Sequence, residues 1–363
     1  MSASSPGEPL EPNLFFQSPM LDAALAHLAP DGVVTLQGVP VHRASGRYGP
    51  LPTPTPLMVW HHPYSMVGLP QITEANPQAD LERLASAITG TFRGRSVLLM
   101  PRLRTDGPFW LIFRTWLEET GRRYTILQEY DRAGIRHLDR LGADLPAMTG
   151  KKSARSIRAS RRKLNALGSL THHTATAGTA LDKALDAFLA LEASGWKAKA
   201  GTALMSVGHD AFVRQSVSAL SKQGRVRIDF TLLDNQPIAG ALILRDGPAA
   251  DPIWMIWKVA YDERYAAHAP GTVMLYDFTE LVLDQARNAA TSFTLDSLAS
   301  PDSMIANRLW RQRWHLADVL VDLQPGGSTA FGSILMAERA RLKAVTAAKS
   351  GRDMLRKALR KRR

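Results

Sequence analysis

The stretch that decides the fold is IWMIWKVAYDERYAAHAPGTVML, residues 253–275. Its first part, 253–261, is a β-type run, and Pro270, Gly271 and Thr272 then open an amphipathic helical pattern. A strand that runs through a loop into a helix N-terminus places free backbone N–H groups and partial positive charge together, which predicts a pyrophosphate site. Gly271 would let the backbone approach the anion closely, and Thr272 would offer a hydroxyl.

The segments around this stretch alternate strand and helix patterns. Two β-type runs before it, VRIDFTLL and PIAGALILR, predict an antiparallel meander that ends in 253–261. The patterns elsewhere predict strands at 32–43, 57–61, 96–101, 123–130, from 292 and at 315–323, and helices at 76–90, 108–120, 149–168, 179–194, 209–222, from 271 and near 301. The fold class expected is α/β (α+β with a mixed sheet), built from two similar units in tandem.

The basic charge is concentrated in two segments. The 363 residues carry a net charge of +12. Residues 338–363 hold eleven Lys/Arg against two acids, and residues 151–163 hold seven Lys/Arg and no acid, so the rest of the chain is mildly acidic. This distribution argues against a uniformly basic nucleic-acid coat protein.

Cysteine usage and hydropathy bound the protein class. The chain has no cysteine, which excludes disulfides, thiolate nucleophiles and Cys-based metal or iron–sulfur sites. No apolar run approaches 18 residues, so we expect no transmembrane helix, and residues 1–13 lack the pattern of a secretory signal. We therefore expect a cytoplasmic protein with a disordered leader over residues 1–13.

Three features of the sequence bear on anion or metal binding. TGKKS at 149–153 lacks the spacing of a phosphate loop, and the adjacent pairs His61-His62 and His172-His173 lack zinc-ligand spacing, so no metal is expected. The helix at 151–163 would place a set of cations on one face: Lys151, Arg155, Arg158 and Arg162. That face is either a solvated surface or a binding face for phosphates, RNA or lipid headgroups.

The tryptophans have two interpretations. Trp254 and Trp257 fall on the third meander strand, and Trp310 and Trp314 fall one turn apart on a helical pattern. Core packing is the simpler interpretation for at least two of these four. Trp196 differs, because it ends a helix within the small and basic segment ASGWKAKAG, which suits the lip of a cleft.

These pieces together resemble a known enzyme group. LEASGWKAKAGTAL, the meander, the K-x-A-Y-D-x-x-Y…P-G segment and LDSLASPDSMIANRLWRQRW are similar to BioF2-like acyltransferases, which include proteins described as cellulose-biosynthesis CelD-like. That group belongs to the GNAT superfamily and is related in fold to FemAB aminoacyltransferases. The resemblance covers residues 150–320 and implies a degenerate GNAT-like unit before them. It divides the chain into a leader (1–13), an N-terminal GNAT-like unit (14–148), a C-terminal acyltransferase domain (149–325) and a basic helical tail (326–363).

The resemblance implies acetyl-CoA or another acyl-CoA as the donor. The strand along the pantetheine would be 254–261 and the pyrophosphate loop 268–272. The donor-binding residues so implied are Trp257, Lys258, Val259, His268, Gly271 and Thr272. Trp310 stands where many GNAT enzymes have a tyrosine as general acid, so the leaving thiolate would need another proton source.

No cysteine is present to carry an acyl group, so direct attack by the amine is expected. The attacking amine must lose a proton, which requires a proton acceptor. Asp296 is the first candidate for the general base, and Glu192, one turn before Trp196, is the second; for each carboxylate a surface or capping role is the alternative. Lys197 and Lys258 suit an anionic group better than a base role, since an unperturbed lysine is charged at neutral pH. Trp196, Lys197 and Trp310 are the expected acceptor-binding residues.

Three functions compete at this point. The first is an acyl-CoA-dependent N-acyltransferase acting on an amino sugar, polysaccharide precursor or other small amine. The second is a FemAB-type aminoacyltransferase that uses charged tRNA, gripped by the helix at 151–163. The third is a non-catalytic GNAT scaffold whose basic tail docks on a membrane or nucleic acid, and in any of them the tail could place the protein at the inner face of the membrane.

Overall fold

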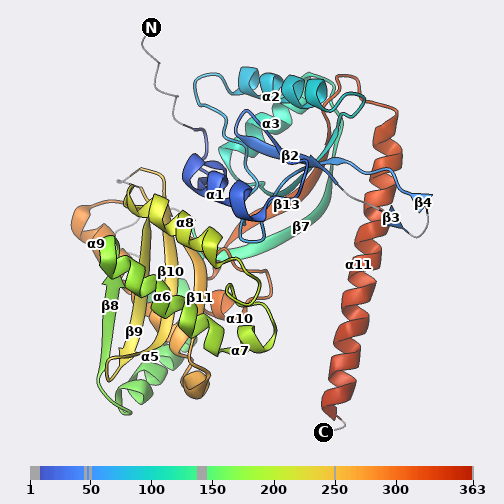
Figure 1. Cartoon of the computed structure of the whole chain (residues 1–363). Coiled ribbons are helices and arrows are strands. Elements are labelled where there is room, and N and C mark those ends of the chain that lie inside the picture. The colour runs from blue at the N-terminus through green and yellow to red at the C-terminus, as the bar shows by residue number, and fades with distance from the viewer. Residues whose placement is uncertain (1–8, 45–46, 49–50, 137–144, 249–250, 362–363) are drawn as a thin grey trace.

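The computed structural model describes residues 9–361 except 45–46, 49–50, 137–144 and 249–250 (Figure 1). The fold is mixed α/β, as expected, and its centre is one large sheet of eleven strands. The strand order is β1-β2-β5-β6-β13-β7-β12-β11-β10-β9-β8, and β3 (Arg47–Tyr48) with β4 (Leu51–Pro52) forms a separate pair. Both halves of the chain therefore contribute to a single sheet.

The first half supplies one end of this sheet and two covering helices. Its elements are η1 (Leu14–Phe16), α1 (Ser18–Leu28), β1 (Val34–Leu36), β2 (Val39–Arg43), β5 (Leu57–Val59), α2 (Pro77–Thr91), β6 (Val97–Arg104), α3 (Pro108–Glu119) and β7 (Tyr124–Ile135). Pro begins α2 and α3 at a position where its missing N–H costs nothing.

The second half supplies the other end. Its elements are α4 (Leu145–Thr149), α5 (Lys151–Asn165), β8 (Leu170–Ala175), α6 (Gly178–Ser194), α7 (Trp196–Lys199), α8 (Asp210–Ser221), β9 (Val226–Leu233), β10 (Gln236–Asp246), β11 (Ile253–Tyr261), η2 (Glu263–His268), α9 (Pro270–Ala289), β12 (Thr294–Asp296), α10 (Met304–Leu309), β13 (Gln312–Asp322) and α11 (Ala330–Lys361). Strands β9, β10 and β11 form the antiparallel meander that the sequence predicts.

The two halves repeat one order of elements. In each, a hairpin and a third strand lead through a helix to a strand that pairs in parallel with the third: β5 with β6, and β11 with β12. A further helix and an antiparallel strand follow in both. This repetition is the tandem arrangement expected from the sequence.

Strand β13 crosses from the second half into the first. It pairs antiparallel with β6 on one side and with β7 on the other, for example Leu320 with Leu99 and with Thr125. Strand β7 in turn pairs with β12 through Ile135 and Leu295. The halves are thus joined by strand exchange as well as by packing.

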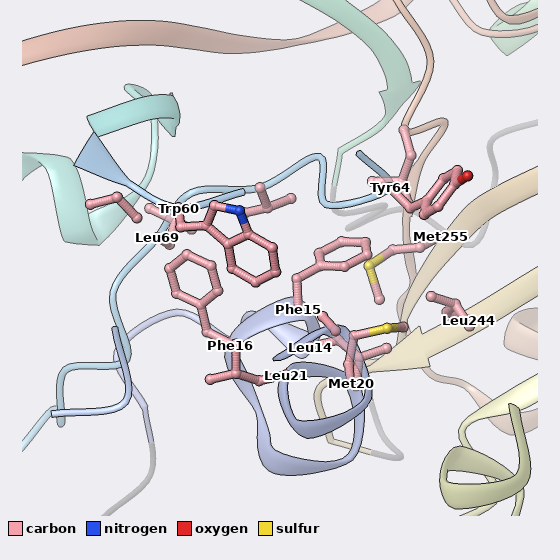
Figure 2. Close-up of a cluster of buried hydrophobic side chains, with 14 of the residues drawn as sticks. Leu14, Phe15, Phe16, Met20, Leu21, Trp60, Tyr64, Leu69, Leu244 and Met255 are labelled. Atoms are coloured by element: carbon pink, nitrogen blue, oxygen red, sulfur yellow. The ribbon is translucent and has the colours of Figure 1, made fainter. Parts of the chain in front are cut away.

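An apolar cluster at the junction adds to this joining (Figure 2). Phe15, Phe16 and Met20 are fully or almost fully buried between Trp60 and Met255, which belongs to the second half. Burying each such side chain contributes about 1.5–3 kcal/mol, so the η1–α1 segment is an integral part of the core.

Three expectations differ from the structure. Residues 9–13 are ordered rather than a leader: Glu11 and Asn13 are buried, and Asn13 donates to the Leu69 carbonyl at 2.8 Å; residues 1–8 lie outside the described residues. The helix α5 begins after Gly150 rather than after Thr149, and Gly150 has a positive φ of 93°. Trp310 ends α10 and Trp314 lies on β13, so they do not share a helix.

The tail is a helix, as expected, and its first turns are attached to the sheet. Phe331 and Ile334 of α11 are buried against Val97, Leu99 and Leu320. From there α11 runs past the rest of the molecule (Figure 1). No helix within the described part of the chain is long and apolar enough to cross a membrane.

Candidate active site

The candidate site is a fork between β11 and β12. These parallel strands pair only at Ile253, Trp254 and Met255 of β11, and beyond Met255 no strand pairs with that edge of β11 within the described residues. On the other edge the register against β10 shifts between Leu242 and Ile243, which leaves Trp257 as an extra residue on β11. Such a bulge redirects side chains and is common beside active sites.

The strand with the free edge leads to the N-terminus of α9. Ala269 adopts a left-handed conformation (φ 49°), and its carbonyl accepts the N–H groups of Thr272 and Val273. His268 Nδ1 is buried without a hydrogen-bond partner. The basic helix α5 packs against both η2 and α9. A helix N-terminus and an unpartnered imidazole nitrogen thus lie at the end of β11, and a basic helix packs against the elements that carry them.

Gly271 lies where helix α9 packs on strand β11. A Cβ atom on Gly271 would meet the side chains of Val259 and Tyr261 at 3.5 Å, which is ordinary van der Waals contact. The missing side chain therefore faces strand β11 and allows α9 to pack closely on it. Thr272 is also buried.

Asp296 is fully engaged and unsuited to the base role. Its Oδ2 pairs with Arg132 Nη1 at 2.9 Å and with Arg104 Nη2 at 3.9 Å, and its Oδ1 accepts the Leu298 N–H at 2.8 Å. Both the Asp296 and the Arg132 side chains are buried. The expectation of a catalytic base is not supported here, because Asp296 joins β12 to the arginines of the first unit.

Glu192 is similarly occupied. Glu192 Oε1 accepts Lys197 Nζ at 2.8 Å, and its Oε2 accepts the Leu204 N–H at 2.9 Å. Lys197 Nζ also donates to the Val259 carbonyl at 3.0 Å. This pair fixes α7 against the free part of β11.

Lys258 is the group in the fork whose chemistry is most altered. Burial, together with the charge of Lys197, lowers the pKa of the Lys258 amine to about 8, although Glu192 acts in the opposite direction. Its Nζ lies 4.1 Å from the centroid of the Tyr64 ring. A buried amine with this pKa can be neutral in a large fraction of molecules just above neutral pH.

Tyr64 belongs to the first unit and was not a sequence candidate. Its ring stacks on Phe212 at 5.7 Å, its hydroxyl lies 2.7 Å from His209 Nδ1, and its carbonyl accepts Trp257 Nε1 at 3.2 Å. Burial, and secondarily Glu192, raises the pKa of Tyr64 to about 12, so the phenol stays protonated. The loop after β5 thus contributes a wall of the second unit's site.

Two arginines hold the loop that carries Tyr64. Arg102 Nη1 donates to the Ser65 carbonyl, and Arg132 Nη2 donates to the Met66 carbonyl at 2.5 Å. Because Arg132 also pairs with Asp296, the fork and the Tyr64 loop share one anchor. No local pattern of the sequence indicates this link, since the partners are 164 residues apart.

The tryptophans divide between core and site. Trp310 is 1% exposed and its Nε1 lies 3.3 Å from Thr279 Oγ1 within the apolar core under α9, a position that favours core packing over the expected acceptor contact. Trp257 is buried beside Tyr64, on the face of β11 that Lys258 also approaches. Trp196 opens α7, but its side chain lies outside what the structure describes.

The open space in the molecule lies elsewhere. Between Glu192, Lys197 and the 259–261 stretch the cavity measures about 10 Å³, so α7 closes over the free edge of β11. A cavity of about 790 Å³ lies between α2, the start of β6 and the start of α11, and shares no residue with the fork. The contacts of the fork carry the assignment, because volume alone identifies no chemistry.

Comparison with known proteins identifies part of the chain. Residues 151–289, from α5 to the end of α9, match the model of the acetyltransferase (GNAT) domain. Comparison with curated protein sequences gave no match.

Three solved structures are similar at low identity. L-PGS from Bacillus licheniformis is 12% identical (92% of this chain, 98% of that one, TM-score 0.47), and FemX is 10% identical (86% and 93%, 0.48). A tandem GNAT protein from the clavulanic acid biosynthesis pathway is 14% identical (86% and 88%, 0.39). At these identities and scores the likenesses indicate nothing about donor or acceptor. The matched residues 151–289, which include β11 and the N-terminus of α9, are similar to a GNAT acetyltransferase domain, and this match supports an acyltransferase.

Proposed function

We propose that the protein transfers an acyl group from acyl-CoA to an amine, with the donor in the fork. The observation that carries this proposal is the unpaired edge of β11 beyond Met255, which leads directly into the N-terminus of α9. An amide-bearing chain such as pantetheine can hydrogen-bond to a free strand edge, and a pyrophosphate can bind at the helix N-terminus. The finer resemblance to BioF2-like enzymes supports an amino sugar or polysaccharide precursor as acceptor.

The residues present fit a phosphorylated donor. His268 offers a buried nitrogen without a partner, and α5, which carries the exposed cations Lys151, Arg155 and Arg158, packs against η2 and α9. Lys197 Nζ donates a hydrogen bond to the Val259 carbonyl. When the donor binds at this edge, a hydrogen bond from the donor to the Val259 carbonyl would replace it. The α7 segment would move away from β11 to admit the donor.

We assign the proton acceptor to Lys258. The acceptor nitrogen attacks the thioester carbon, the C–S bond breaks, and the nitrogen proton passes to the neutral Lys258 amine and then to the departing thiolate. Asp296 and Glu192 are both held in ion pairs, which favours Lys258 over them, and the lowered pKa of Lys258 removes the objection that a lysine stays charged. Tyr64 and Trp257 position the amine.

A tRNA-dependent transfer is the second candidate. The exposed cations of α5 favour it, because a row of cations on one helix face binds an RNA backbone as readily as a pyrophosphate. The carbonyl chemistry at the fork would be the same, with an ester in place of the thioester. The non-catalytic scaffold is the third candidate.

Calorimetric titration with acetyl-CoA, longer acyl-CoAs and total tRNA separates these candidates. Acyl-CoA binding without tRNA binding is the expected result; tRNA binding alone supports the second candidate, and neither supports the third. Turnover by the protein that binds acyl-CoA should rise with an apparent pKa near 8. Lys258→Met should lower kcat by about 10²-fold or more while donor affinity is kept. An unchanged pH profile in Lys258→Met would exclude Lys258 as the base.

A further inference from the structure

The helix α11 is rigidly held at its start. Asp322, fully buried at the end of β13, accepts the Ser328 N–H, the Ser328 hydroxyl at 2.8 Å and the Ser96 hydroxyl at 2.7 Å. Phe331 and Ile334 then dock on the sheet. The direction of the helix is therefore set by the body of the protein.

Between Lys343 and Arg352 the helix is not packed against the rest of the protein. Every side chain from Lys343 to Arg352 is exposed, and α11 extends away from the sheet (Figure 1). The 32 residues of α11 span about 48 Å at 1.5 Å per residue. An isolated helix of this kind normally has a binding surface, since packing supplies most helical stability in proteins.

The sequence of α11 from Ala340 to Lys361 is amphipathic and strongly basic. At about 100° per residue, one stripe of the helix collects only small and apolar residues. Its members are Ala340, Ala344, Ala347, Ala348, Gly351, Met354, Leu355, Ala358 and Leu359. The cations occupy the rest of the circumference, with Lys343, Arg352 and Lys361 at the borders of the stripe: Lys343, Lys349, Arg352, Arg356, Lys357, Arg360 and Lys361. Asp353 is the one acid between Lys343 and the end of the chain.

We propose that α11 binds the surface of an anionic membrane, with its apolar stripe in the headgroup region and its cations toward the lipid phosphates. Charge complementarity selects this occupant, because the cations flank an apolar stripe as in helices that lie in the membrane interface. A nucleic acid would use the cations but leave the stripe exposed. Because the contacts of Asp322, Phe331 and Ile334 already fix the start of α11, binding to a membrane requires little further ordering of the chain.

The first test is co-sedimentation with vesicles of phosphatidylcholine alone or with 30 mol% phosphatidylglycerol. The intact protein is compared with a version ending at Leu342, which keeps Phe331, Ile334 and the Glu338–Arg341 ion pair. A cut at Gly327 would uncover the sheet and is therefore avoided. We expect the intact protein alone to sediment, only with the anionic vesicles, and less as salt shortens the Debye length from about 10 Å at 0.1 M to about 3 Å at 1 M.

A matched pair of variants separates stripe insertion from charge attraction. Leu355→Gln with Leu359→Gln alters the stripe, whereas Thr346→Gln with Ser350→Gln alters the polar side; neither pair changes charge, and Gln is a good helix former. The first pair should weaken vesicle partitioning at least about tenfold, and the second should leave it within about twofold. Equal effects of the two pairs, equal sedimentation of the intact and shortened proteins, or binding of total tRNA without binding of vesicles would each overturn the proposal.

Discussion

Replacing Lys258 by methionine should stabilise the protein at neutral pH. Burial holds the pKa of this amine at about 8, below its ordinary value of 10.5. One unit of pKa corresponds to about 1.4 kcal/mol, so the buried ammonium costs the fold about 3 kcal/mol. The Tyr64 ring, 4.1 Å away, attracts the ammonium and makes this figure an upper bound. Methionine fills a similar volume without charge, so the variant should gain about 2–3 kcal/mol at pH 7.

The gain should fall as the pH rises. Below pH 8 both the folded and the unfolded wild-type chain carry the proton, and the full cost is present. Between about 8 and 10.5 the folded Lys258 releases its proton while the unfolded one keeps it, so the wild type becomes more stable with rising pH relative to the variant. From pH 7 to pH 9.5 the difference between the two proteins should shrink by about 2 kcal/mol.

Urea unfolding of wild type and Lys258→Met at pH 7 and pH 9.5 measures this difference directly. Comparing the two proteins at each pH cancels the titration of every other group. Lys258→Arg serves as the control. It keeps its charge through the whole range, so the difference in stability between Lys258→Arg and Lys258→Met should not change with pH. A constant difference between wild type and Lys258→Met would show that the amine has its ordinary pKa, and the assignment of the proton acceptor would fail with it.

Two further predictions follow from the contacts of the fork. Asp296→Asn leaves the buried Arg132 without its partner and should lower the free energy of unfolding by about 3–5 kcal/mol in urea titration; normal stability with lost turnover would restore the base assignment. Gly271→Ala places its Cβ in ordinary contact with Val259 and Tyr261, so the protein should fold and bind acyl-CoA within about twofold of wild type by calorimetry; a tenfold loss would mean that Gly271 faces the donor.

The fold class was predictable because most elements carry local signals. Proline begins α2 and α3, glycine follows α3, and turn residues separate the meander strands, so the expected and observed ranges agree closely, although α2 continues one residue past the expected stop at Gly90. Trp314 shows the limit of such patterns. A helical spacing from Trp310 placed both on one helix, but pairing with β6 and β7 makes Trp314 part of a strand. Tertiary pairing decided a segment whose local pattern was ambiguous.

The site was only partly predictable for a similar reason. Lys258, Lys197 and Glu192 were identified from the sequence, and the structure brings them together. The roles that we propose for them differ from the expected ones, because the role of a side chain depends on its partners. Glu192 forms an ion pair with Lys197, and burial lowers the pKa of Lys258. Tyr64 lies about two hundred residues from Lys258 in the sequence, and only the fold brings the two side chains into contact.

The position of β13 between β6 and β7 has a consequence for synthesis on the ribosome. The strands of the first half leave the ribosome long before residues 312–322, which pair with both of them. Until that segment emerges, β6 and β7 each expose a strand edge that can pair with other chains. The first half therefore has no complete sheet of its own during translation, and an expressed fragment of residues 1–148 should aggregate where the whole chain folds.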